Sequence, residues 1–332
     1  MFRLAVEDLN KKATVTCVSD GNEALKKIKS QDYDVIIIDL ENSGMEIGGL
    51  LKRITMEIPK ALILVTAQSS SVSDGLCAEA MAKGAFDYFI KPIYNSYIEN
   101  FNLAKQKISD IFGIIYQECS IDTKPETGPA VKKGAHSNNK LQLNIALIAV
   151  STGGPLAMEN IFSKLSKDFP IPILAIQHIP PQFTDQLAYF LNQKSQLTIK
   201  VAEHMEQIKA GTVYIAPGGA HMMLNSKYVI HMSDSPPING IRPAADVLFE
   251  SVADSFSDIG VLAVILTGMG NDGEKGLACL KKKLGCICLA QSEKTCVVYG
   301  MPRAAVESGF ADKILDLDEI SVEMENLVAN NT

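Results

Sequence analysis

Several features are missing from this 332-residue chain, and each absence excludes a class of protein. No apolar run approaches the roughly 20 residues of a membrane-spanning helix, so we expect no membrane insertion. The first residues do not resemble a signal peptide. The seven cysteines are odd in number and scattered, which excludes a disulfide framework. We therefore expect a protein of the reducing cytoplasm.

The chain also lacks an excess of basic residues and a zinc-binding cysteine pattern. Its formal net charge is −7, which argues against a general electrostatic mode of nucleic-acid binding. Cys286 and Cys288 have no matching second pair, so we expect no zinc site. The composition, with 47% hydrophobic and 21% charged residues, is typical of folded globular domains. The length is sufficient for two of them.

Short apolar strands alternate with helical patterns along the first part of the chain. The expected strands are 14–18, 34–39, 61–66 and 86–91, and the expected helices are 22–28, 50–54, 74–83 and 98–112. Because this alternation predicts a parallel sheet covered by helices, we assign residues 1–118 to one α/β domain. Residues 119–140 are polar, contain Pro and Gly and show no periodicity, so we interpret them as a linker. Residues 141–332 form the second domain, with buried strands expected at 144–150, 171–176, 212–216, 261–266 and 285–290.

Three polar residues lie at the carboxyl ends of strands in the first domain. Asp39, Thr66 and Lys91 should therefore meet at one edge of the sheet. An acid, a hydroxyl and a cation at this edge suit a phosphoryl group carried by the acid. The arrangement resembles the receiver domain of bacterial response regulators, which implies a flavodoxin-like fold.

The resemblance also implies roles for individual residues of this domain. Asp39 would be the phospho-acceptor and Lys91 the phosphate-contacting lysine. Thr66 would be the switch hydroxyl and Tyr88 the switch aromatic. Phosphorylation in this family uses Mg²⁺, for which Asp39 would be a ligand if the receiver is complete.

The sequence departs from the receiver pattern at its start. Receivers begin with a strand that ends in an acidic pair, whereas this chain starts where the first helix is expected. Glu7 and Asp8 lie on a helical pattern and do not replace that pair. Either the start is truncated, or the domain is a degenerate receiver that takes no phosphate. Both interpretations count against Mg²⁺ binding by this chain.

Three short polar sequences, 151–154, 177–181 and 266–273, follow expected strands of the second domain. They place Ser151, His178 and Asp272 at the carboxyl ends of parallel strands, where one crevice can hold all three. Ser151 would attack a carbonyl, His178 would take its proton and Asp272 would orient the imidazole. The residues alone leave other uses open: a phosphate cradle, a helix cap at the serine, or a simple turn at the aspartate.

Residues 143–315 resemble the catalytic domain of the chemotaxis protein-glutamate methylesterase (CheB) family. The matching stretches, in order, are 151–155, 177–184, 214–222, 242–249, 264–273 and 290–302. The resemblance implies a doubly wound, mostly parallel α/β domain. The roles that it implies are Ser151 as nucleophile, His178 as base, Asp272 as orienting acid, and Thr152, Gly153 and the N–H of Met269 at the oxyanion loop.

The same resemblance implies hydrolysis of glutamyl methyl esters on the cytoplasmic helices of chemoreceptors, with release of methanol, and deamidation of particular glutamines there. The partners would be methyl-accepting chemotaxis receptors as substrates and the chemotaxis histidine kinase as phosphodonor. Phosphorylation of the receiver would relieve inhibition. The hydrolysis would need no metal or organic cofactor.

Two departures leave a second hypothesis, a catalytically weakened receptor-binding adaptor. The receiver is incomplete, and Ala149-Val150 replaces the family's usual Gly-Ala before the serine. A third hypothesis, nucleotide binding, has little support because no Walker lysine follows the Ser151 turn. For Arg242 we expect either contact with a receptor carboxylate or a brace to Asp246.

Overall fold

The computed structural model describes residues 2–58, 61–68, 76–77, 80, 83, 85, 87–91, 96, 98–102, 104–105, 108–109 and 141–331. The chain divides into two compact units, Met1–Lys124 and Pro125–Thr332. The predicted linker, 119–140, lies outside the described residues, as does much of the predicted helices 74–83 and 98–112. None of the described helices is long and apolar enough to cross a bilayer.

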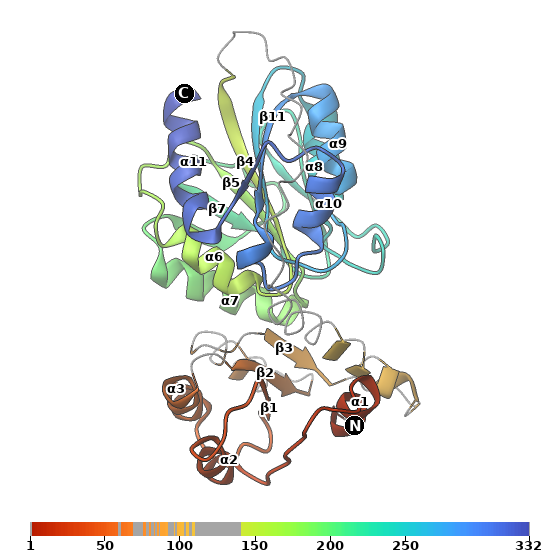
Figure 1. Ribbon diagram of the computed structural model, residues 1–332. Helices are drawn as coiled ribbons and strands as arrows, with labels where there is room; N and C mark the ends of the chain where they lie inside the picture. The colour runs from red at the N-terminus through yellow and green to blue at the C-terminus, as the bar shows by residue number, and fades with distance from the viewer. Residues whose placement is uncertain are drawn as a thin grey trace, which may run out of the picture. The chain divides into compact units, whose positions relative to one another are not determined.

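The described residues of the first unit form a parallel sheet of three strands in the order β1-β2-β3 (Figure 1). Its described elements are α1 (Phe2–Leu9), α2 (Gly21–Ile28), β1 (Val35–Asp39), α3 (Ile47–Glu57), β2 (Leu62–Ala67) and β3 (Asp87–Ile90). Helix α2 begins after Asp20, whose carboxylate accepts the N–H groups of Asn22 and Glu23. The alternation of strands and helices predicted from the sequence is confirmed for these elements.

Residues 14–18 do not form the predicted strand, although their backbone has no helical structure either. A cavity of about 400 Å³ is lined by Thr16 and Val18 and also by all five residues of β1. A strand needs a hydrogen-bonded neighbour. Among the described residues, β1 pairs only with β2, and its other edge faces this cavity, so residues 14–18 do not reach β1 to form a ladder.

The second unit is built on a seven-stranded parallel sheet in the order β12-β11-β10-β4-β5-β7-β6. Its strands are β4 (Leu143–Val150), β5 (Ile173–Gln177), β6 (Thr198–Val201), β7 (Thr212–Ile215), β10 (Gly260–Ile265), β11 (Gly285–Gln291) and β12 (Lys313–Leu315). A separate antiparallel hairpin joins β8 (His221–Leu224) and β9 (Ile230–Ser233). Strands β6, β8, β9 and β12 are not among those expected from the sequence, and they have three or four residues each.

Helices cover both faces of this sheet. They are α6 (Gly154–Phe162), α7 (Pro181–Lys194), α8 (Ala245–Ser255), α9 (Glu274–Lys283), α10 (Met301–Glu307) and α11 (Leu317–Asn331). Helices α6, α7 and α11 lie on one face, and α8, α9 and α10 lie on the other (Figure 1). The chain leaves β4 toward α6 and leaves β10 toward α9, on opposite faces. The carboxyl ends of these neighbouring strands therefore border the crevice where open α/β sheets bind ligands.

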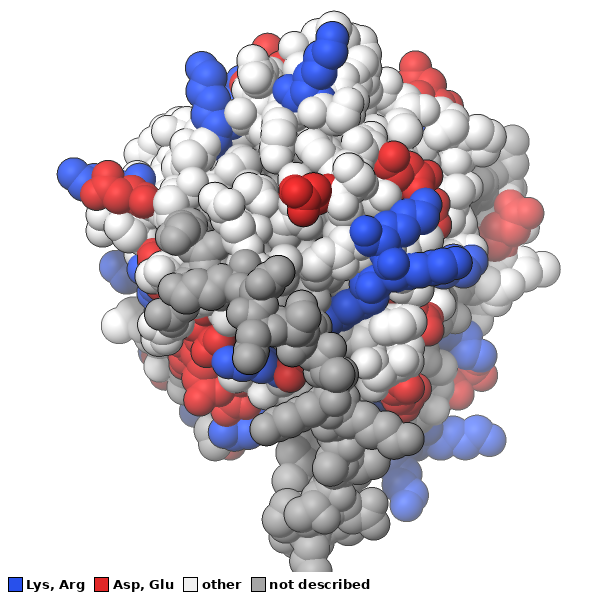
Figure 2. Space-filling view, turned by 90° about the horizontal axis from the view of Figure 1, so that it is seen from above, with Lys and Arg blue, Asp and Glu red and all other residues white. Residues whose placement is uncertain are grey.

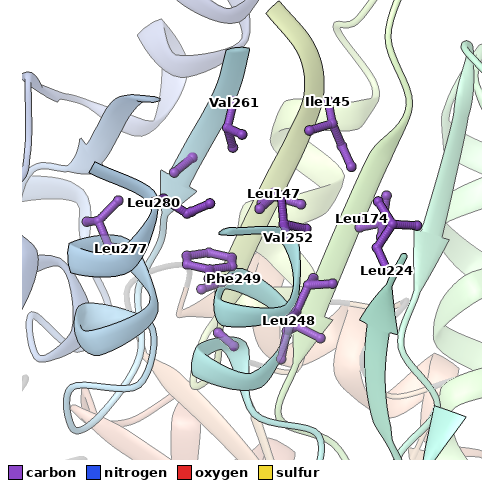
Figure 3. Packing of buried hydrophobic residues seen from close by; sticks show 14 of the residues in the cluster. Ile145, Leu147, Leu174, Leu224, Leu248, Phe249, Val252, Val261, Leu277 and Leu280 are labelled. Atoms are coloured by element: carbon purple, nitrogen blue, oxygen red, sulfur yellow. The ribbon is translucent and has the colours of Figure 1, made fainter. Parts of the chain in front are cut away.

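Helices α8 and α9 pack on the sheet and on each other around a buried apolar core. The side chains labelled in Figure 3 are buried and come from β4, β5, β8, β10, α8 and α9. A Cβ placed on Gly276 of α9 would lie 2.5 Å from Cβ of Phe249 in α8, so the two helices pack at nearly backbone distance. Close packing of this kind leaves little room for either helix to move.

Charge on the surface is mixed. On the face shown in Figure 2, basic and acidic side chains lie interspersed among uncharged ones. The described residues on that face form no extended surface of one sign.

Candidate active site

Ser151 and His178 follow two strands that are paired in register. Val150, the last residue of β4, lies opposite Gln177, the last residue of β5. Ser151 and His178 directly follow these two strands. The N–H of His178 donates to the carbonyl of Val150 at 3.2 Å, and the N–H of Ser151 donates to the carbonyl of Thr267 at 3.0 Å. Backbone hydrogen bonds therefore hold together the segments after β5, β4 and β10.

His178 and Asp272 are in direct contact. His178 Nε2 lies 2.7 Å from Asp272 Oδ2, and the two side chains are 11% and 4% exposed. The same Oδ2 accepts the N–H of Ala245 at 2.6 Å, and Oδ1 accepts the N–H of Asp246 at 3.0 Å. Because Nε2 faces a carboxylate, it carries the proton, and Nδ1 is the nitrogen left to accept one.

The surroundings of Asp272 favour its charged form. Burial alone would raise the pKa of this carboxyl group, but the hydrogen bond and charge of His178 and the two backbone N–H groups outweigh burial and lower the pKa. A charged carboxylate beside an imidazole stabilises the imidazolium that forms when the imidazole acts as a base.

Glycines allow the backbone to come close to the serine. Gly153 has φ +78°, and a Cβ at this position would lie 2.6 Å from the side chain of Val297. A Cβ on Gly268 would lie 2.8 Å from Cβ of Ser151. The next residue is Met269, whose side chain is 48% exposed and whose N–H has no acceptor among the described residues. This N–H and the turn at Thr152 and Gly153 lie on the two segments that border the serine.

Sequence reasoning did not assign a role to Gln177, the last residue of β5. Its side chain is buried, and Nε2 donates to the carbonyl of Ser151 at 3.0 Å and to that of His178 at 3.1 Å. One amide group therefore ties the serine segment to the histidine segment. The available signal was a polar residue at the end of a buried apolar strand, since buried polar groups are nearly always hydrogen-bonded.

Thr267 is a second residue that the sequence did not single out. Its buried hydroxyl donates to the carbonyl of Thr152 at 3.0 Å and accepts the N–H groups of Val297 and Val298 at 3.0 and 2.9 Å. A hydroxyl has one donor and two acceptor sites, so this one is fully used. It joins the serine turn, the segment after β10 and the segment before α10.

The structure also places Val150 and Arg242, two residues singled out in the sequence. Val150 is fully buried at the end of β4, and its side chain occupies space beside Gly154 that a Cβ there would need. The brace between Arg242 and Asp246 does not form, because the Arg242 guanidinium instead donates to the carbonyls of Asp234 and Ser235.

In the first unit, the residues predicted to carry phosphate lie along one sheet edge. Asp39 and Thr66 are register partners, and Lys91 directly follows β3. Lys91 Nζ lies 2.6 Å from Asp39 Oδ1 and 2.8 Å from Glu41 Oε2. Burial would lower the pKa of Lys91, but its hydrogen bonds to both carboxylates outweigh burial and raise the pKa. The sequence did not suggest Glu41, whose other oxygen accepts the N–H of Gln68 at 2.6 Å.

The surroundings of Thr66 and Tyr88, the other two predicted receiver residues, give less support for a phosphoryl site. The Thr66 hydroxyl is buried and lies at a long 3.5 Å from the carbonyl of Ile38. Burial raises the pKa of Tyr88 well above its ordinary value, so its phenol stays neutral.

The described residues do not form a magnesium cage. Mg²⁺ prefers an octahedral set of oxygens. Asp39 and Glu41 supply carboxylates, but the ammonium group of Lys91 binds both of them. Within the described part of the chain, no group of three or more His, Cys, Asp or Glu side chains is placed to hold a metal ion.

In comparison with known proteins, each of the two units matches a protein family. Residues 146–324 match the CheB methylesterase family, and residues 2–100 match the response regulator receiver domain. A protein-glutamate methylesterase/protein-glutamine glutaminase of Halalkalibacterium halodurans is 37% identical, over 91% of this chain and 87% of its own length. One from Thermotoga maritima is also 37% identical, over 93% and 89%. The crystal structure of the Thermotoga maritima CheB methylesterase catalytic domain matches at a TM-score of 0.53 and 41% identity, covering 57% of this chain and 100% of that one.

Proposed function

The chain belongs to the CheB methylesterase family and is a protein-glutamate methylesterase/protein-glutamine glutaminase, and we propose that Ser151, His178 and Asp272 carry out its reaction. The observation that carries this proposal is the 2.7 Å contact between His178 Nε2 and Asp272 Oδ2, beside a serine at the end of the neighbouring strand. Such a set of side chains is suited to acyl transfer.

In the first half of the proposed reaction, Ser151 Oγ attacks the ester carbonyl carbon and His178 Nδ1 takes the hydroxyl proton. The carbonyl oxygen becomes an oxyanion, to which the N–H of Met269 and the turn at Thr152 and Gly153 can donate. The intermediate expels methoxide, which takes the proton from His178 and leaves as methanol. In the second half, His178 Nδ1 takes a proton from water as the water oxygen attacks the acyl-serine carbonyl carbon. It then gives that proton to Ser151 Oγ as the acyl–oxygen bond breaks, and the glutamic acid formed ionises to the carboxylate. A glutamine side chain would follow the same route with ammonia as the leaving group.

The test compares methanol release from a methylated chemoreceptor by the unsubstituted chain and by Ser151→Ala. We expect the variant to lose release while its thermal melting stays within the error of the unsubstituted chain. Unchanged release in Ser151→Ala would refute the serine mechanism. Receptor binding without any release by the unsubstituted chain would favour the adaptor hypothesis, which the relatives do not favour.

For the first unit, we propose that Asp39 is the phospho-acceptor and Lys91 its charge partner. The support is their 2.6 Å contact at the edge of a receiver sheet. The phosphodonor would be the chemotaxis histidine kinase, and the substrates would be methyl-accepting receptors with their glutamates in the cytoplasm. Mass spectrometry of the chain after treatment with a phosphodonor tests this assignment, and phosphate on another residue would refute it.

A further inference from the structure

Helices α8 and α9 begin without side-chain caps of their own. Ala244 precedes α8 and Gly273 precedes α9, and neither residue caps its helix with a side chain. The first N–H groups of a helix have no acceptor within that helix. In this structure each helix start receives its acceptor from the other one.

The exchange involves two buried carboxylates. Asp272, just before α9, accepts the N–H groups of Ala245 and Asp246 at the start of α8. Asp246 Oδ1 in turn accepts the N–H groups of Gly273 at 3.0 Å and Gly276 at 2.8 Å, at the start of α9. Helix starts carry partial positive charge, so both carboxylates lie where negative charge is stabilised.

The proposed reaction does not use the carboxylate of Asp246 directly. Its residue is 4% exposed, and its hydrogen bonds go to backbone N–H groups of α9. Burial raises the pKa of this group, and the nearby charge of Asp272 adds to the rise. A buried carboxylate is unfavourable unless it is hydrogen-bonded, so these two bonds account for its place in the structure.

We propose that Asp246 is a positioning residue for the acid of the Ser-His-Asp set. It holds Asp272 twice: its backbone N–H binds Oδ1 of Asp272, and its side chain binds the N–H of Gly273, the residue joined to Asp272. Loss of the side-chain bonds would free the segment that aligns Asp272 with His178. This inference rests on the proposed function.

The experiment measures kcat and KM for methanol release by Asp246→Ala, Asp246→Asn and Asp246→Glu. A misplacement of about 1 Å can lower a rate on the order of 10²-fold, so we expect that fall in kcat for Asp246→Ala, with little change in KM. Asp246→Asn keeps an Oδ1 that accepts both N–H groups and should restore most of kcat. Asp246→Glu keeps the charge but displaces it, so its kcat should also fall.

Asp254→Ala is the matched control. Asp254 lies on the same helix, is exposed and pairs with Lys283 of α9, so its loss removes a carboxylate between the same two helices without touching the site. We expect its kcat to equal that of the unsubstituted chain. Melting temperatures show which variants are folded at the assay temperature, and Asp246→Glu supplies the test if Asp246→Ala does not fold.

Unchanged kcat in both Asp246→Ala and Asp246→Glu would overturn the inference. It would also be overturned if Asp246→Asn fell as far as Asp246→Ala, because the lost acceptor would then not be the cause. A second readout, the rate at which Ser151 reacts with a small organophosphonate ester, needs no receptor. If the unsubstituted chain reacts with that ester but releases no methanol, the proposed function fails, and the labelling rates of the variants still decide the role of Asp246.

Discussion

Replacing Gln177 by methionine separates the alignment of the site from the stability of the fold. Methionine has nearly the same length and shape but cannot donate hydrogen bonds. The variant therefore loses the links from Gln177 Nε2 to the carbonyls of Ser151 and His178. Each segment keeps its backbone bonds, including that from the N–H of Gly154 to the carbonyl of Ser151 at 2.8 Å.

The expected change in the free energy of unfolding is small because two effects oppose each other. Two lost hydrogen bonds cost about 1–3 kcal/mol together. However, Gln177 Oε1 is buried and has no partner among the described residues, and removing such an atom recovers about 1–3 kcal/mol. We expect a net change within about 1 kcal/mol. The rate is more sensitive, because the serine and the base are no longer joined, and we expect kcat to fall on the order of 10²-fold.

The assay measures methanol release from a methylated receptor, with urea denaturation of the same samples. Gln186→Met is the matched control, since Gln186 also has a buried Oε1 without a described partner but lies on α7. We expect this control to keep kcat. An unchanged kcat in Gln177→Met would refute the alignment argument. A loss of stability of several kcal/mol would refute the balance of hydrogen bonds.

Three further predictions concern packing, acid stability and phosphorylation. Gly268→Ala puts a Cβ 2.8 Å from that of Ser151, so urea denaturation should show a loss of about 1–3 kcal/mol, together with a lower kcat. The pKa of Asp272 is lowered in the folded state, so its carboxylate stabilises the fold at pH values above the ordinary pKa of about 3.9. This contribution is lost as the pH falls through the lower folded pKa. Asp272→Asn should therefore lose less stability than the unsubstituted chain when the pH is lowered from about 5 to below 3, as measured by urea denaturation. Glu41→Gln removes one of the two carboxylate charges that pair with Lys91, so labelling of the phospho-acceptor by acetyl phosphate should increase, as measured by mass spectrometry. A decrease in labelling would contradict competition between Glu41 and the phosphoryl group for the lysine.

The residues that the sequence predicted share a local signature, whereas the positioning residues do not. Ser151, His178 and Asp272 each follow a buried strand, and parallel strands bring such positions to one edge. Gln177 and Thr267 also end or follow strands, but their roles depend on hydrogen bonds to carbonyls 26 and 115 residues away. Strand alternation does not specify such pairs, because any buried polar group at these positions would produce the same pattern.

In the first unit, too, the local sequence pattern does not determine which segments pair. The apolar pattern predicted β1, β2 and β3, but it also predicted a strand at 14–18, where the cavity beside β1 leaves no pairing partner. Local propensity describes which residues suit a pleated surface, and the strand exists only when a neighbour supplies the other half of the ladder.

The two sites use charge in opposite ways, and this difference bears on regulation. Asp272 is balanced by His178 and by backbone donors at the start of α8, so the proposed acid and base are held together before substrate arrives. Lys91 instead already has two carboxylates as partners. An acyl phosphate at Asp39 would carry about −1.5 to −2 charge at pH 7 in place of the −1 of the free carboxylate, and its oxygens would need the same ammonium group. If Asp39 is the phospho-acceptor, as we propose, its phosphoryl oxygens would compete with Glu41 for Lys91. Glu41 also binds the N–H of Gln68, so its release would reach the segment after β2 as well as the acceptor itself.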